Sequence, residues 1–270
     1  MKDVLPMDSD IRQAPSYTLS QKVRGYLQRL PSRALFRRPC RIETDVPLVS
    51  FTFDDFPRSA LLTGGAILRT HAATGTYYAA FGLMGQQAPA GQIFYAEDLD
   101  RLFKEGHELG CHTFDHCHSF EANPLAFEDS IVRNLSALRE LFPSASFRSF
   151  SYPMAEPRLR IKRNASRHFL CCRGGDQKLN EGTADLNRLS AFFLEKSWGG
   201  PAAAKRMIDR NQKSRGWLIL ATHDVSDTPS RFGCTPGFFE DIVKYAIASG
   251  ARVLPVAQAC ELLTANYRVR

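Results

Sequence analysis

Carboxylate and imidazole side chains stand directly after apolar runs of this sequence. Asp54 and Asp55 follow the run Leu48–Phe53, and His223 follows Trp217–Thr222. Two adjacent carboxylates repel each other unless a cation or a shared proton relieves them. The pair therefore indicates either a cation site or a turn that caps the strand. A histidine in the same position on another strand fits a general acid or a residue that caps the core.

Two histidines four residues apart, His112 and His116, lie at and after the end of a third run, Glu108–His112. One helical turn or a tight loop can direct the rings of His112 and His116 at one point. Two imidazoles and one carboxylate make a site for a first-row divalent metal with open positions for water. Zincin proteases share this spacing but need Glu after the first histidine, where this chain has Thr113. Together with the two aspartates, the pair favours a metal site over a structural role.

The elements that must position these residues alternate between short apolar runs and helical periodicity from Val46 onward. Such alternation is typical of β/α units around a parallel sheet. Six to eight units in this length suggest an α/β barrel, whose active sites lie at the carboxyl ends of the strands. An open doubly wound sheet is the alternative. Strands are expected at 48–53, 75–81, 108–112, 146–153, 169–172, 189–194, 217–222 and 251–256, and helices at 59–71, 96–104, 125–141, 202–213 and 236–249.

A basic extension, residues 1–45, precedes the expected barrel domain, residues 46–270. Eight Lys and Arg and no acidic residue lie between Ile11 and Ile42, whereas the 270-residue chain carries 35 basic and 28 acidic residues, a net charge of +7. Within it, Tyr17–Leu30 predicts an amphipathic basic helix. The surplus in residues 11–42 favours an anionic partner, such as a membrane surface or a phosphorylated lipid carrier, over nucleic acid. A solvated arm, or a helix packed on its own domain, is the alternative.

The cysteine pattern bears on the compartment. The chain has seven cysteines, an odd number, with no CxxC pair, which indicates reduced thiols in a reducing compartment. No apolar run approaches the length of a membrane-spanning helix, and the first residues lack the apolar core of a secretory signal. We therefore expect a cytoplasmic protein, with a peripheral position at the inner face of the membrane as an option.

Three motifs in order resemble the polysaccharide deacetylases of the NodB-homology type, carbohydrate esterase family 4, from about Val46 to Ala259. The TFDD motif is Thr52–Asp55, the H(S/T)xxH motif is His112–His116, and the last motif is the strand that ends at His223. The resemblance implies a distorted, NodB-like (β/α) barrel of roughly seven to eight strands. It also implies a hydrolase that removes an N-acetyl group from an amino sugar.

The same resemblance assigns roles to the motif residues. It implies Asp54 as the catalytic base and His223 as the general acid. It implies Asp55, His112 and His116 as ligands of a divalent metal, usually zinc, with cobalt, nickel or iron as alternatives. These roles fit the chemistry, because a metal acidifies a bound water while a carboxylate and an imidazole hold different protonation states in one pocket.

Other motifs of the family are altered. Phe56 follows TFDD where the family usually has glycine. The RxPY motif of the family aligns with Ser151-Tyr152-Pro153-Met154. In this alignment Ser151 stands in place of the arginine and Met154 in place of the tyrosine. Arg148 or Arg188 would substitute for the missing arginine.

The DxxDW motif and the last motif are altered as well. No DxxDW motif is recognisable, and Asp176 or Asp185 would orient His223 instead. Ile219 and Ala221 occupy the leucine positions of the last motif. A small residue there implies a wider acyl pocket.

We therefore expect a metal-dependent deacetylase acting on the N-acetyl or similar acyl amide of an amino sugar, in a polysaccharide, oligosaccharide or glycolipid. One alternative is a non-catalytic carbohydrate- or lipid-binding relative that lost activity with the motif arginine. Another is an amidohydrolase of the same superfamily that acts on a non-sugar amide.

Overall fold

Seven parallel strands close into a barrel in the computed structural model, which describes residues 30–154, 156–196 and 199–268. The ring closes because β11 pairs with β2 along its whole length, from Trp217 against Leu48 to Thr222 against Phe53. Closure excludes the open doubly wound sheet and confirms the expected barrel. In order around the ring the strands are β2 (Leu48–Phe53), β3 (Thr76–Ala79), β6 (Glu108–Cys111), β7 (Ser149–Ser151), β8 (Cys171–Asp176), β10 (Leu189–Phe193) and β11 (Trp217–Thr222).

An eighth strand distorts the ring. The short strand β12 (Arg252–Val253) pairs with Leu48 and Val49, at the beginning of β2. Strand β3 pairs with Thr52 and Phe53, at the end of β2. Because β11 occupies the other edge of β2, β12 and β3 share one edge, one behind the other. The expected count of seven to eight strands is thus confirmed.

Alternate residues of the strands face the inside and the outside of the barrel. On β2, Phe51 and Phe53 face outward, and each ring lies 5.5 Å from the ring of Phe239 on helix α7 (Pro236–Ala248). Ser50 faces inward and accepts a hydrogen bond of 3.0 Å from Trp217 Nε1. Because every second residue faces inward, Ser50 and Thr52 are followed by Asp54, which faces inward just past the end of β2.

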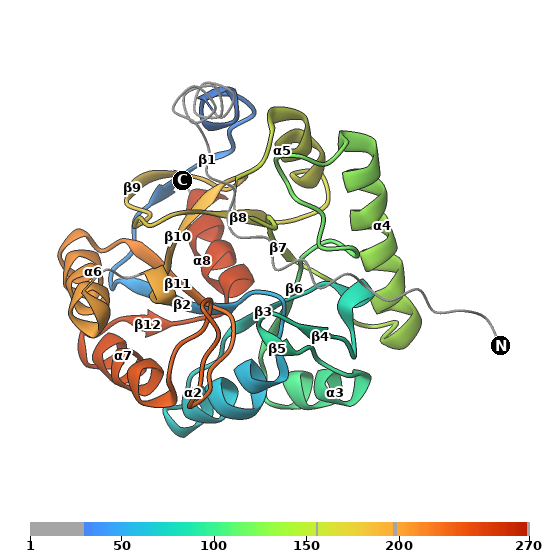
Figure 1. Cartoon of the computed structure of the whole chain (residues 1–270). Helices are drawn as coiled ribbons and strands as arrows, with labels where there is room; N and C mark the ends of the chain where they lie inside the picture. The colour runs from blue at the N-terminus through green and yellow to red at the C-terminus, as the bar shows by residue number, and fades with distance from the viewer. Residues whose placement is uncertain (1–29, 155, 197–198, 269–270) are drawn as a thin grey trace, which may run out of the picture.

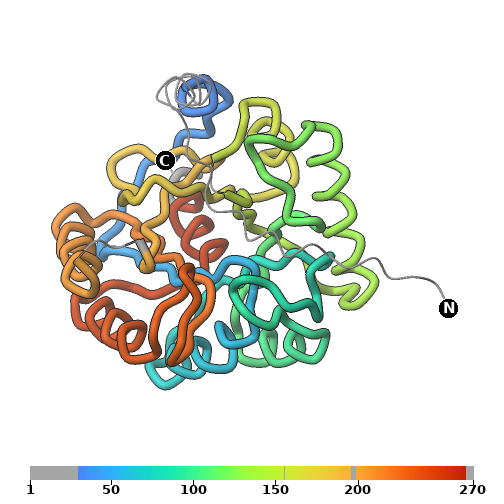
Figure 2. Tube along the Cα trace, viewed as in Figure 1, coloured from blue at the N-terminus to red at the C-terminus, as the bar shows by residue number. Residues whose placement is uncertain are grey.

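Helices surround most of the ring, and the chain passes around the ring in sequence order (Figures 1 and 2). The last helix, α8, packs instead on the beginnings of β2, β8, β10 and β11, where Cys260 is fully buried. Two backbone N–H groups of its first turn donate to Thr76 Oγ1 and Glu108 Oε2, each at 2.9 Å. Helix α8 therefore closes the amino-terminal end of the barrel and leaves the carboxyl end open. The helices are α2 (Ala66–Thr70), α3 (Ala96–Lys104), α4 (Pro124–Leu141), α5 (Leu159–Ala165), α6 (Gly200–Ser214), α7 and α8 (Val256–Arg268), with short helices η1 (Ala60–Gly65), η2 (Phe81–Leu83) and η3 (Leu194–Lys196).

The described part of the extension packs on the barrel. Strand β1 (Pro39–Ile42) pairs antiparallel with β9 (Gly182–Asp185). The buried Lys162 donates to the carbonyls of Ser32 and Leu35 at 2.7 and 2.9 Å and forms an ion pair of 2.6 Å with Asp185. These contacts fix residues 32–42 on the domain. The amphipathic helix expected over 17–30 lies, apart from its last residue, outside the described residues. The remaining two strands, β4 (Gln87–Ala88) and β5 (Gly91–Gln92), form a separate hairpin.

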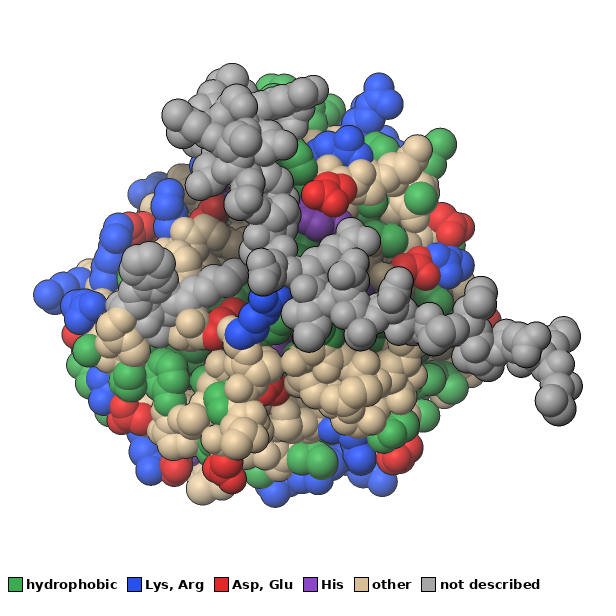
Figure 3. Space-filling model, in the orientation of Figure 1, with side chains coloured by type: hydrophobic (Ala, Val, Ile, Leu, Met, Phe, Trp, Pro, Cys, Tyr) green, Lys and Arg blue, Asp and Glu red, His purple; other side chains and the backbone are tan. Residues whose placement is uncertain are grey.

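The surface carries charges of both signs. On the face shown in Figure 3, Lys and Arg side chains lie mostly at the periphery, interleaved with Asp and Glu. No helix among the described residues is long and apolar enough to cross a bilayer.

Candidate metal and catalytic site

The polar residues singled out by their spacing meet at the carboxyl end of the barrel. Asp54 and Asp55 follow β2, His112 follows β6, and His223 follows β11. Strand pairing continues one residue past the strands, since Asp54 N donates to Thr222 O at 2.9 Å and His112 N donates to Ala79 O at 3.0 Å. The common direction of the strands therefore delivers all of these side chains to one rim.

Asp55, His112 and His116 form a compact group of potential metal ligands. Asp55 Oδ1 lies 3.5 Å from His112 Nε2 and 3.0 Å from His116 Nε2. One donor atom from each residue lies within 4.8 Å of the other two, and no other such group of three occurs in the described residues. Asp55 Oδ1 is buried and accepts no hydrogen bond. Two imidazoles and an unsatisfied carboxylate oxygen fit a divalent ion of the zinc type.

The protonation of His112 suits a ligand. Its Nδ1 lies 2.8 Å from the carbonyl oxygen of Ser151, and a carbonyl can only accept, so the proton belongs on Nδ1. Burial lowers the pKa of His112 to about 4, which leaves the ring neutral at pH 7. The lone pair of Nε2 therefore faces Asp55. A backbone partner of this kind commonly orients a metal-bound histidine.

The charges of the other two residues support each other. Burial raises the pKa of Asp55, but contact with His116 and the nearby histidines outweighs it and holds the pKa well below its usual range. Burial lowers the pKa of His116, but its contact with Asp55 outweighs that and raises it. An ionised carboxylate thus lies between the two rings.

Tight loops, rather than a helical turn, aim these side chains. Thr113 and His116 have positive φ angles of 61° and 51°. Asp55 and Phe56 have positive φ angles of 61° and 51°. Glycine adopts such angles without strain, which explains why the related motif carries glycine where this chain has Phe56. Here packing holds the strained residue, because its buried ring stacks on Phe94 with centroids 4.8 Å apart.

A buried arginine holds the first aspartate of the pair. Asp54 is 5% exposed and Arg173, on β8, is 1% exposed. Arg173 Nη2 donates to Asp54 Oδ1 and, at 2.6 Å, to Ser151 Oγ. Its guanidinium also lies over the rings of Tyr78 and Phe193, 5.1 and 5.4 Å from their centroids. Burial raises the pKa of Asp54, but Arg173 and the nearby histidines outweigh it and lower the pKa, so Asp54 is ionised.

Arg173 was not anticipated, and the two expected arginines lie elsewhere. Arg148 precedes β7, at the closed end of the barrel, and pairs with Glu261 of α8. Arg188 pairs with Asp176 at 2.6 Å. Neither contacts Asp54 in the structure. The expectation that one of them substitutes for the motif arginine is therefore replaced by Arg173. The available signal was an arginine directly after the expected strand 169–172, at an inward position of the alternation in β8.

The carboxylates expected to orient His223 are also engaged elsewhere. Asp176 binds Arg188, and Asp185 binds Lys162. His223 Nδ1 instead lies 3.2 Å from the carbonyl oxygen of Phe232. Its Nε2 lies 4.0 Å from Asp55 Oδ2, so the ring faces the ligand group.

The remaining motif residues differ in burial and in depth along the barrel. Tyr152 is buried and donates to Asn187 O at 3.0 Å, whereas Met154 is 61% exposed. The carbonyl of Pro153 accepts a hydrogen bond from Ser119 Oγ. Ala221, paired with Thr52, is fully buried one inward position below His223, and Ile219 lies one further position inside. Of the two expected acyl-pocket residues, Ala221 is thus nearer the rim.

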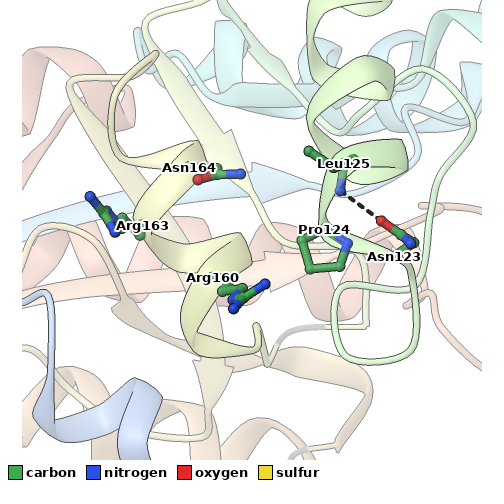
Figure 4. Close-up of a pocket in the computed structure, with 6 residues that line it drawn as sticks. All are labelled: Asn123, Pro124, Leu125, Arg160, Arg163 and Asn164. Carbon is green, nitrogen blue, oxygen red and sulfur yellow. Dashed lines mark hydrogen bonds between the residues drawn. The ribbon is translucent and has the colours of Figure 1, made fainter.

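A separate hollow of about 460 Å³ lies outside the barrel, between the start of α4 and α5 (Figure 4). It is lined by Asn123, Pro124, Leu125, Arg160, Arg163 and Asn164. None of these residues belongs to the group at the carboxyl end of the barrel.

The family model described as polysaccharide deacetylase matches residues 41–169, which include the metal-ligand group. This part of the chain belongs to the polysaccharide deacetylase family. No curated protein matches the chain.

Solved structures of polysaccharide deacetylase relatives share the fold. A family 4 acetyl xylan esterase from Clostridium thermocellum, in complex with a cobalt ion, is 19% identical, with a TM-score of 0.56 over 80% of this chain and 91% of that one. A peptidoglycan deacetylase from Bacillus subtilis is 18% identical, with a TM-score of 0.52 over 83% and 95%. A CE4 family pseudoenzyme from Bacillus anthracis is 12% identical, with a TM-score of 0.56 over 81% and 66%. At these identities the likeness establishes the fold alone.

Proposed function

We propose that the chain is a metal-dependent deacetylase that hydrolyses the N-acetyl, or a similar small acyl, amide of an amino sugar in a saccharide or glycolipid. One observation carries the proposal. The ligand group of Asp55, His112 and His116 lies beside an ionised carboxylate on Asp54 and an imidazole on His223, all at one open rim. These are the parts that amide hydrolysis by an activated water requires.

A divalent ion held by Asp55, His112 and His116 would polarise the acyl carbonyl and lower the pKa of a bound water. The donor set of two nitrogens and one oxygen suits zinc, and it also suits cobalt, nickel or iron.

The chain's own groups balance the protons. As the water oxygen bonds to the acyl carbon, Asp54 takes one water proton. Arg173 keeps Asp54 ionised and fixed in place for this step. When the carbon–nitrogen bond breaks, the leaving nitrogen takes a proton from His223 Nε2. The products are a carboxylic acid and a free amine.

The first test combines metal content with acetate release. Wild-type protein should contain about one zinc, cobalt, nickel or iron ion per chain by elemental analysis, and His112→Ala should lose it. His118→Ala is a matched control, because His118 lies in the same loop, is partly exposed and does not belong to the ligand group. Acetate release should follow the metal content. Absence of metal from wild type after incubation with divalent ions would refute the proposal.

Substrate panels separate the competing activities. Chitooligosaccharides test the sugar amide, small cyclic amides test the non-sugar amide, and acetylated xylan tests an ester, since one similar structure is an acetyl xylan esterase. A protein that binds metal and saccharide but turns over none of them would be a non-catalytic relative, like the pseudoenzyme of similar fold. The pairing of Asp54 with Arg173 favours an active enzyme over that alternative.

Docking on an anionic membrane or a phosphorylated lipid carrier, at the inner face of a cytoplasmic membrane, stays a separate proposal for residues 11–42. Within the described residues, Arg33 pairs with Glu156, Arg41 pairs with Glu43, and Arg38 donates to the carbonyl of Phe169. Of the four basic residues described there, Arg33 and Arg41 therefore have their charges paired within the protein. Co-sedimentation of the full chain with anionic liposomes at low salt tests the proposal, and absence of binding would reject it.

A further inference from the structure

The loop that connects β11 to α7 begins with His223 and folds back on itself. We propose that residues 224–234 form a clasp that aims the His223 ring at the reacting group, with Asp224 and Ser230 as its positioning residues. This inference rests on the proposed function for the role of His223. The arrangement of the loop itself is independent of that function.

The inner part of the clasp is a closed hydrogen-bonded ring. Asp224 is buried, 4% exposed, although it is a carboxylate. Its Oδ2 accepts from Ser230 N at 2.8 Å, and its Oδ1 accepts from Ser230 Oγ. The carbonyl of Asp224 accepts from Cys234 N at 3.0 Å. Gly233 lies against the same carboxylate so closely that a Cβ there would overlap it. Together these contacts fix the far side of the loop relative to β11.

The outer part of the clasp holds the histidine. Phe232 lies between Ser230 and Gly233, and its carbonyl accepts from His223 N at 3.2 Å. The same carbonyl lies 3.2 Å from Nδ1 of the His223 ring, and the rings of the two residues lie 5.2 Å apart. Because a carbonyl only accepts, the Nδ1 proton is held there. Nε2 then faces Asp55, 4.0 Å away.

The clasp does the work that a carboxylate partner would otherwise do. Among the described residues, the only carboxylate within ion-pair distance of His223 is Asp55, and it faces Nε2. The neighbouring Asp224 binds Ser230 instead of the ring. The direction of the ring thus depends on where the loop places the carbonyl of Phe232. Ser230 hydrogen-bonds to Asp224 and to Phe232 N, and to neither the ring nor the ligand group, so a change at Ser230 should reach catalysis through that carbonyl.

Two acetylated substrates distinguish a change in the orientation of the His223 ring from a general loss of folded enzyme. An amine leaves only with a proton, so N-acetylated chitooligosaccharides need His223, whereas p-nitrophenolate leaves p-nitrophenyl acetate without one. Ser230→Ala should lower kcat on the chitooligosaccharide by about tenfold, a part of the 10²–10⁴ that a general acid contributes, with KM unchanged. Asp224→Asn should lower it further, because both bonds to Ser230 weaken. Activity on p-nitrophenyl acetate should stay within about twofold for both variants.

Ser249→Ala is the matched control. It also deletes one hydroxyl-to-carbonyl hydrogen bond, Ser249 Oγ to Ala246 O at 2.7 Å, but at the end of α7. It should change neither activity. An equal loss on both substrates, a loss in KM alone, or no loss in Ser230→Ala would overturn the clasp.

A measurement without turnover keeps the two proposals apart. In the full-length chain above pH 8, ring ¹⁵N shifts of His223 should report the Nδ1–H tautomer, with mixed tautomers in Asp224→Asn. The same tautomer population in both proteins would overturn the clasp even in an active enzyme. If wild type hydrolyses neither substrate, the proposed function fails, and the tautomer measurement alone decides the clasp.

Discussion

Removing Arg173 should expose the cost of burying a lone carboxylate. In Arg173→Met the volume of the side chain is largely kept, but Asp54 stays buried, at 5% exposure, without its cation. Breaking one partner of a buried ion pair typically costs about 3–5 kcal/mol. For a domain of this size that corresponds to a fall in Tm on the order of 10 °C. Without Arg173, burial raises the pKa of Asp54. If Asp54 takes up a proton, the buried charge disappears, and the loss in unfolding free energy lies at the lower end of the range of about 3–5 kcal/mol.

The double variant distinguishes charge from packing. Asp54→Asn together with Arg173→Met removes both charges, so it should be more stable than Arg173→Met alone by about 1–3 kcal/mol. Thermal and denaturant unfolding of the four proteins completes the cycle. If the two single losses simply add in the double variant, the pair is not coupled and the reasoning is wrong. A second double variant, Ser151→Arg with Arg173→Ser, returns a guanidinium to Asp54 from β7. It should be more stable than Arg173→Ser alone.

Three further predictions concern the frame of the site. Glu108→Ala should lower the free energy of unfolding by about 2–4 kcal/mol, because it leaves Ala257 N and Ser149 Oγ without their acceptor, and metal content should not change. Burial lowers the pKa of His107. The unfolded chain therefore binds more protons below about pH 6.5, and stability should fall as pH drops through that window; His107→Gln should reduce the slope of unfolding free energy against pH. Phe56→Gly should relax the backbone at φ 51° but lose the stacked ring, for a net loss of about 2–4 kcal/mol; a stabilised variant in a melting experiment would contradict this.

Elements with a strong pattern could be predicted from the sequence. The strands expected at 48–53 and 217–222 and the helix expected at 96–104 have those bounds in the structure. The apolar run and the amphipathic period are local properties, so no partner is needed to read them. By contrast, β1 and β9 lie in polar segments and exist because they pair with each other. The strand expected at 251–256 is only Arg252–Val253, because α8 begins at Val256.

The candidate site also has residues that could be predicted from the sequence and contacts that could not. Asp55, His112 and His116 could be anticipated as a group, because Asp55 and His112 follow the ends of parallel strands, which converge, and His116 lies four residues after His112. Their catalytic roles, with those of Asp54 and His223, remain predictions. What held Asp54 and His223 could not be anticipated. The partner of His223 is a backbone carbonyl, which no residue type reveals.

The position of Arg173 shows why a motif can be lost while its contact remains. Neighbouring strands of a sheet lie about 4.8 Å apart, a distance that an arginine side chain spans. At the rim of a barrel, a guanidinium can therefore reach the same carboxylate from either of two adjacent strands. Ser151 leaves room on β7, and Arg173 enters from β8 with its hydrogen bond of 2.6 Å to the Ser151 hydroxyl. The motif fixes a position along one strand, whereas the chemistry needs only a cation at a point in space. A search for the motif therefore misses Arg173, which the register between β7 and β8 places beside Ser151.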